Sequence, residues 1–100
     1  DFTFMYNELQ DTVGCSRTVP VMHVQPFNVE FNNNVAHGFH LLLQEFPGVE
    51  FCLHAHSHSL LHKELFDDGI PYIGCAAMKD KNYLLFTLTP GGYEYEVVYY

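Results

Sequence analysis

The chain has 100 residues, of which 48% are hydrophobic and 16% aromatic, a composition typical of one small globular domain and not of a disordered or fibrous protein. Its formal charge of -8 comes from 12 acidic residues against four basic ones, which argues against a surface that binds a nucleic-acid backbone. Phosphate esters stay open as ligands, because bound divalent metal ions would add local positive charge.

Cellular context is indicated by three further features. No apolar run approaches the ~20 residues that span a bilayer, and the first residues do not form a signal peptide, so we expect no membrane association. Cys15, Cys52 and Cys75 are odd in number and form no CxxC pair, which favours reduced thiols in a cytoplasmic protein. The missing initiator Met and a start inside a helix-like pattern predict a piece of a longer protein.

The first part of the chain has a helix pattern followed by a strand pattern. Apolar residues at helical spacing predict a short amphipathic helix over residues 2–10. The Val-rich run over residues 19–24, opened by Pro20 and ended by Pro26, predicts a buried strand. His23 would therefore lie near the carboxyl end of that strand.

A second helix and a second strand follow. Asn34 is the expected N-cap of a helix implied by the apolar residues between Val35 and Phe46, which Pro47-Gly48 ends. Residues 49–53 then predict a short strand that leads directly into His54-Ala55-His56-Ser57-His58. A second group of histidines thus follows a second strand.

Beyond the histidine cluster the pattern changes to consecutive strands. Thr89-Pro90-Gly91-Gly92 is a strong hairpin signal, and alternating apolar residues in the last strand predict one exposed face. The predicted strands cover residues 62–66, 70–73, 83–88 and 93–99, with a turn at 67–69.

Two histidine groups at two strand ends indicate a metal site, because ligands of open sheets collect beyond the carboxyl ends of the strands. Neutral imidazole is a preferred ligand of Zn, Fe and Mn, and His56 and His58 could each reach a different ion of a close pair. We interpret His37, His40 and His62 as surface or hydrogen-bonded core residues.

The order of these elements resembles the calcineurin-like metallophosphoesterase family, in which a strand leads to a histidine, then a helix follows, and an apolar strand leads into Gly-His-x-His before several antiparallel strands. Residues 19–23 and Ala55-His56-Ser57-His58 match these motifs, and residues 68–73 are similar to the usual continuation. Ala55 departs from the usual Gly, and would cost about 1 kcal/mol if its φ were positive; His54 and His56 are then the alternative pair.

The resemblance implies the C-terminal half of a four-layer α/β/β/α sandwich, formed by residues 1–100 as two strand-helix units followed by antiparallel strands. It implies a phosphoesterase that hydrolyses phosphate mono- or diesters at a centre of two divalent metal ions (Mn, Fe, Zn or similar), with His23, His56 and His58 as ligands. The family's Asp-x-His, Gly-Asp-x-x-Asp and Gly-Asn-His motifs are missing here. We therefore expect an N-terminal half, or another chain, to cover the exposed sheet.

Two other interpretations stay open. A small non-catalytic domain could bind a structural Zn, with His54 or Cys52 as the obvious fourth ligand. A degenerate phosphoesterase half could act as a scaffold. Neither the substrate nor the metal is specified by the sequence.

Overall fold

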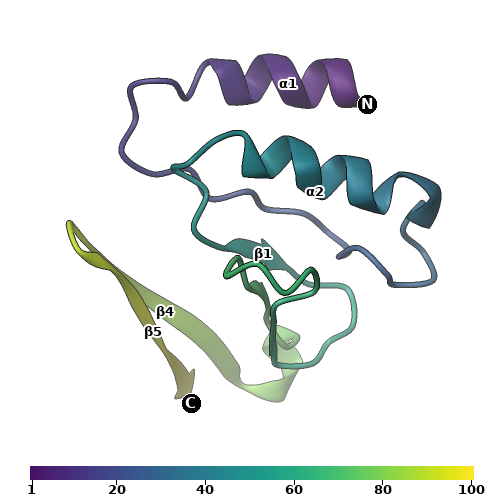
Figure 1. Cartoon of the computed structure of the whole chain (residues 1–100). Helices are drawn as coiled ribbons and strands as arrows, with labels where there is room; N and C mark the ends of the chain where they lie inside the picture. The colour runs from purple at the N-terminus through teal and green to yellow at the C-terminus, as the bar shows by residue number, and fades with distance from the viewer.

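Two helices lie above five strands in the computed structural model, which describes residues 1–100 (Figure 1). The chain is therefore a small mixed α/β domain. No helix is long and apolar enough to cross a membrane. The helices are α1 (Phe2–Gln10) and α2 (Ala36–Gln44), and the 3₁₀ turns are η1 (Asn33–Val35) and η2 (Met78–Asp80).

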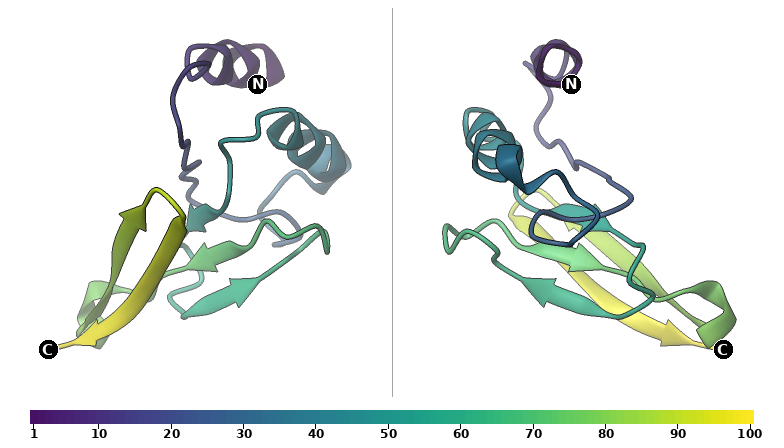
Figure 2. Two further views of the ribbon diagram at one scale, coloured as in Figure 1. Left: turned by 60° about the vertical axis from the view of Figure 1, so that its left-hand side comes forward. Right: turned by 90° about the vertical axis from the view of Figure 1, so that its right-hand side faces the viewer.

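The strands form two separate sheets. β1 (Cys52–His54), β3 (Tyr72–Gly74) and β2 (Leu61–Lys63) make a three-stranded sheet in that order, with β3 parallel to β1 and antiparallel to β2. β4 (Asn82–Thr89) and β5 (Gly92–Tyr99) make a long antiparallel hairpin beside this sheet (Figure 2).

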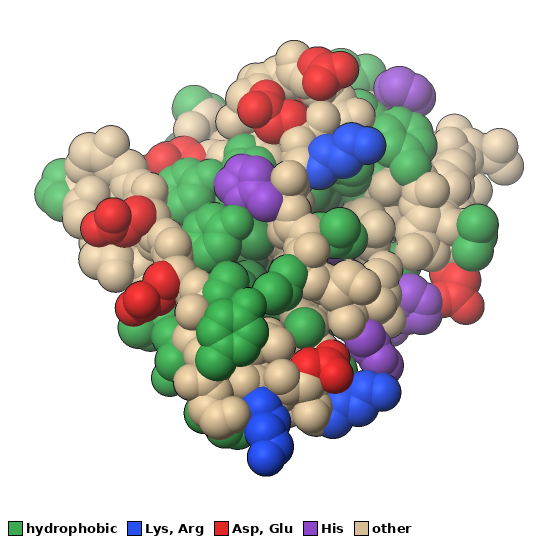
Figure 3. Space-filling model, turned by 90° about the horizontal axis from the view of Figure 1, so that it is seen from below, with side chains coloured by type: hydrophobic (Ala, Val, Ile, Leu, Met, Phe, Trp, Pro, Cys, Tyr) green, Lys and Arg blue, Asp and Glu red, His purple; other side chains and the backbone are tan.

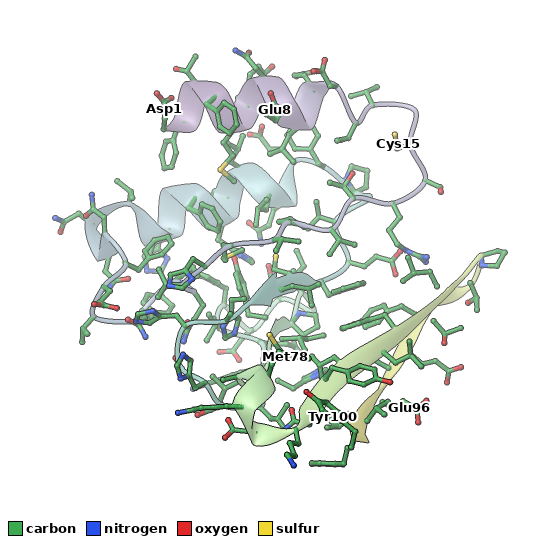
Figure 4. All side chains as sticks on the ribbon, turned by 180° about the vertical axis from the view of Figure 1, so that it is seen from behind. Asp1, Glu8, Cys15, Met78, Glu96 and Tyr100 are labelled. Atoms are coloured by element: carbon green, nitrogen blue, oxygen red, sulfur yellow. The ribbon has the colours of Figure 1, made fainter.

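The helix predicted over residues 2–10 and the C-terminal hairpin are confirmed. Helix α1 has these bounds, and the Asp1 side chain caps it by accepting a hydrogen bond from the Phe4 amide at 3.0 Å. Thr89 pairs with Gly92 across the turn that the sequence predicted. Figure 4 shows the other end of the hairpin, where the Tyr100 hydroxyl donates to the Met78 carbonyl at 3.2 Å.

The prediction of a buried strand over residues 19–24 is wrong. Residues 18–24 make only isolated parallel bridges, Thr18 to Val49 and Val21 to Leu53, and Val21 is 74% exposed. The segment has a hydrogen-bonding partner on one side only, because the amide and carbonyl groups of Val19 and Val21 make no backbone hydrogen bond. One edge of the sheet is therefore open along this segment.

The predicted cap of the second helix is also wrong. Asn34 lies inside the 3₁₀ turn, Val35 is the N-cap of α2, and no side chain caps the first turn. The α-helix is accordingly shorter than the apolar pattern implied.

Three predicted strands are shifted and shortened by their partners. All three residues of β3 pair on both sides, with β1 and with β2, so these neighbours are three residues long as well. Pro71 has no amide hydrogen and limits the ladder before β3. The observed strands 52–54, 61–63 and 72–74 replace the predicted 49–53, 62–66 and 70–73.

An aromatic stack and an arginine help to attach the hairpin to the rest of the chain. Phe51, just before β1, stacks on Phe86 and Tyr93 at centroid distances of 5.1 and 4.2 Å. Arg17 pairs with Glu50 at 2.9 Å and donates to backbone carbonyls at the hairpin turn. These contacts hold the hairpin against β1.

A polar chain that is buried at His40 and Tyr72 and exposed at its other end joins α2 to the sheet. His40 is 2% exposed; its Nδ1 lies 2.9 Å from the Tyr72 hydroxyl, and its Nε2 contacts the Asp68 carboxylate. Gln44 donates to the same carboxylate at 2.7 Å, and Phe66 stacks on the His40 ring. Because every polar group here has a partner, the chain fixes the helix against β3 without leaving an unsatisfied group.

We expect Asp68 to make stability fall in acid. Burial acts to raise the pKa of Asp68, but hydrogen bonds from His40, the Ile70 amide and Gln44 outweigh it, so the pKa lies below its ordinary 3.8. As the pH falls, the Asp68 carboxylate therefore takes up a proton in the unfolded state before it does so in the folded state. Its contribution to the free energy of unfolding is lost as the pH falls through the pKa of the folded state. Because Asp68 is partly exposed and water screens its interactions, denaturant unfolding of Asp68→Asn should show a loss of at most about 1 kcal/mol at pH 7 and a flatter pH dependence below about pH 4.

Asp67 is the exposed neighbour of Asp68, so Asp67→Asn is the matched control. This variant should keep the same dependence of stability on pH as the unmodified chain. An unchanged slope in Asp68→Asn would contradict this account of the network.

Candidate metal centre

His23 and His56 are brought together by parallel pairing of two backbone segments. The Met22 amide donates to the Leu53 carbonyl at 2.9 Å, and the Ala55 amide donates to the His23 carbonyl at 3.1 Å. The two histidines therefore leave adjacent segments at the same, carboxyl edge of the sheet. This is the edge at which open sheets collect ligands.

The two imidazole rings contact each other directly. Nδ1 of His56 lies 2.9 Å from Nε2 of His23, and the ring centroids are 4.8 Å apart at an interplanar angle of 72°. The other ring nitrogen of His56, Nε2, contacts the carboxylate of Glu30. Both nitrogens of His56 thus have a partner, one a ring nitrogen and the other a carboxylate.

The turn that carries these histidines has an uncommon backbone. His56 and His58 have φ values of 63° and 54°, in the left-handed region, whereas Ala55 does not have a positive φ. Ala55, which stands where the Gly-His-x-His motif has Gly, is therefore not strained by a positive φ. Left-handed conformations cost roughly 1–2 kcal/mol in non-glycine residues, and such residues concentrate at functional sites.

His58 is not brought into the pair. Its side chain is exposed and makes neither a hydrogen bond nor an aromatic contact with His23 or His56. No group of three or more His, Cys, Asp or Glu side chains is arranged to hold a metal ion. The structure thus unites two of the three predicted ligands, and the role of His58 stays a prediction.

His54, the alternative partner of His56, faces elsewhere. It is 4% exposed and lines an apolar cavity of about 310 Å³ between β1, β3 and β4, and its Nδ1 has no hydrogen-bond partner. Desolvation lowers the pKa of His54, so the ring is neutral at pH 7. It makes no hydrogen bond and no ring contact with His23 or His56.

Cys52 is not brought into the pair either. It is fully buried, burial raises the pKa of its thiol to about 12, and it belongs to no group of three or more side chains that could hold a metal ion. All three cysteines are free; Figure 4 shows Cys15 in the loop after α1. Neither candidate for the fourth ligand of a structural zinc site therefore joins the histidine pair.

The other histidines have the non-ligand environments that the sequence analysis gave them. Both ring nitrogens of His40 are used, by Tyr72 and Asp68. His37 lies against aromatic rings, and His62 Nδ1 lies 2.6 Å from the Tyr95 hydroxyl. The acidic partner of His40, Asp68, lies in a turn 28 residues further along the chain.

Glu30 is the site residue that sequence reasoning missed. It lies in an asparagine-rich loop with no motif of its own, and its contact with His56 bridges 26 residues of sequence. The only available signal was an acid seven residues after His23.

No family model, no curated protein and no solved structure matches the chain. Two imidazoles with converging nitrogens, at the carboxyl edge of a sheet, can share one transition-metal or zinc ion.

The absence of a side chain at Gly74 leaves space for the imidazole ring of His54. A Cβ built on Gly74 would lie 2.5 Å from Cε1 of His54, closer than real contacts allow, and His54 is enclosed. We expect Gly74→Ala to destabilise the fold by about 1–3 kcal/mol in denaturant unfolding. Gly91→Ala is the control, because a Cβ there meets nothing within 4 Å. Equal effects of the two substitutions would contradict the steric account.

Proposed function

We propose that the chain is the metal-binding C-terminal segment of a two-metal phosphoesterase, which hydrolyses phosphate mono- or diesters. The observation that supports it most is the meeting of His23 and His56, from segments 33 residues apart, at the edge of the sheet where ligands bind. The sequence around these two residues is the part that resembles the phosphoesterase family.

The residues present fit a metal ion. Zinc lies about 2.0–2.1 Å from imidazole nitrogens, so two nitrogens on one ion lie about 3 Å apart or slightly more. Nε2 of His23 and Nδ1 of His56 are separated by 2.9 Å, and small rotations of partly exposed rings would admit the ion. In this proposal His23 and His56 hold one ion, and His58 holds the second.

Two bound divalent ions would supply Lewis acidity and a hydroxide nucleophile at neutral pH. The chain's own contribution is the histidine set. Because His23, His56 and His58 bind as neutral ligands, they leave the positive charge of the ions available to an anionic phosphate. That charge would offset the formal -8 of the chain near the site.

The carboxylate ligands that two ions need come, in this proposal, from outside these 100 residues. The unpaired amide and carbonyl groups of Val19 and Val21 form an open sheet edge next to His23. Open edges favour pairing with a further strand. Exposed apolar side chains also gather on the lower face of the molecule (Figure 3), as expected of a surface that packs against an N-terminal half or another chain.

Removal of a ligand is the direct test. In the full-length protein, His23→Ala and His56→Ala should each lower the affinity for Mn²⁺ by at least about 100-fold and slow hydrolysis of an aryl phosphate in parallel, since even indirect contacts of a ligand cost 10–100-fold. Metal content by elemental analysis and initial rates measure both effects. His37 is an exposed residue of α2, so His37→Ala is the control. It should leave the metal affinity and the rate of hydrolysis unchanged.

Full metal content and activity in His56→Ala would overturn the proposal. Metal stoichiometry separates the alternatives: two ions with turnover agree with the phosphoesterase, one tightly held Zn without turnover identifies a structural zinc domain, and absence of both metal and turnover identifies a scaffold.

A further inference from the structure

Glu30 is presented to the histidine pair by a loop that its own asparagines organise. The Asn28 side chain accepts a hydrogen bond from the Glu30 amide at 2.9 Å. The Asn33 side chain accepts from the Phe27 amide at 2.7 Å and donates to the Asn28 carbonyl at 2.9 Å. These local bonds satisfy the backbone of the loop and fix the point from which Glu30 extends.

The contact of Glu30 with His56 specifies which nitrogen of His56 carries the proton. A carboxylate only accepts hydrogen bonds, so a neutral His56 must donate to it from Nε2. Nδ1 then has a free lone pair, and it is this nitrogen that points at His23. The hydrogen-bond network thus assigns the tautomer in which Nδ1 can bind a metal.

Folding stability does not account for this contact. The Glu30 side chain is 58% exposed, and exposed ion pairs add little to stability because water screens them. The same geometry has a larger effect on a metal ligand, because a carboxylate on the distal ring nitrogen orients the ring and raises its basicity.

We propose that Glu30 is a positioning residue of the metal centre: through Nε2 of His56 it holds the ring in the orientation and tautomer that direct Nδ1 to the ion shared with His23. This inference rests on the metal-binding part of the proposed function. Glu30 itself does not touch the ion or the substrate.

The test uses Glu30→Ala and Glu30→Gln in the full-length protein, with Mn²⁺ as the probe. Glu30→Ala should weaken Mn²⁺ binding by about 10–100-fold. In the metal-free protein, ¹⁵N spectra of the His56 side chain should change from the Nε2–H tautomer to a mixture. Glu30→Gln retains an acceptor oxygen for Nε2–H and should restore the tautomer and most of the affinity. Neither substitution should lower Tm appreciably, and Glu96→Ala, an exposed acid on β5, is the control.

The outcomes separate this inference from the function. If the unmodified protein binds Mn²⁺ and hydrolyses aryl phosphate while Glu30→Ala leaves both affinity and tautomer unchanged, the role of Glu30 is overturned and the phosphoesterase stands. If Glu30→Ala weakens Mn²⁺ binding as expected but the unmodified protein has no phosphoesterase activity, the function is overturned and the positioning role stands. If the unmodified protein binds no Mn²⁺, both are overturned.

Discussion

The parallel pairing of residues 20–23 with β1 is the constraint on which the candidate site depends. The Leu53 amide donates to the Pro20 carbonyl, and its carbonyl accepts from the Met22 amide, so the two segments advance in register toward the same edge. His23 and His56 follow directly from that register. A slip of one residue would point the side chains to the opposite face and separate the rings.

The rest of the fold keeps β1 in place. On one side β3 pairs with it in parallel, and the His40 chain ties β3 to α2 through Tyr72 and Asp68. On the hairpin side, Phe51 stacks on two rings. The site therefore rests on a strand held from several directions, whereas Glu30 reaches it from a loop. This division is common in proteins, since rigid elements place ligands precisely in space and loops adjust them.

Local patterns in the sequence were enough to predict α1 and the C-terminal hairpin. Helical periodicity, the Pro-Gly-Gly turn and strand alternation each depend only on residues that are close together in the sequence. The sequence also indicated that His23 and His56 would meet, since two strand ends share an edge. What it could not show depends on contacts between distant segments. The short β1 and β2 follow from the length of β3, and the partner of His40 comes from a turn 28 residues away. Glu30 lacks any motif, so only the folded loop reveals it.

Whether His23 and His56 bind one metal ion between them can be seen in an anomalous diffraction map of full-length protein crystals soaked in Mn²⁺. We expect a peak bonded to Nε2 of His23 and Nδ1 of His56, with Glu30 on the far nitrogen of His56. Two rings still hydrogen-bonded to each other, with the metal absent or held by other residues, would contradict it.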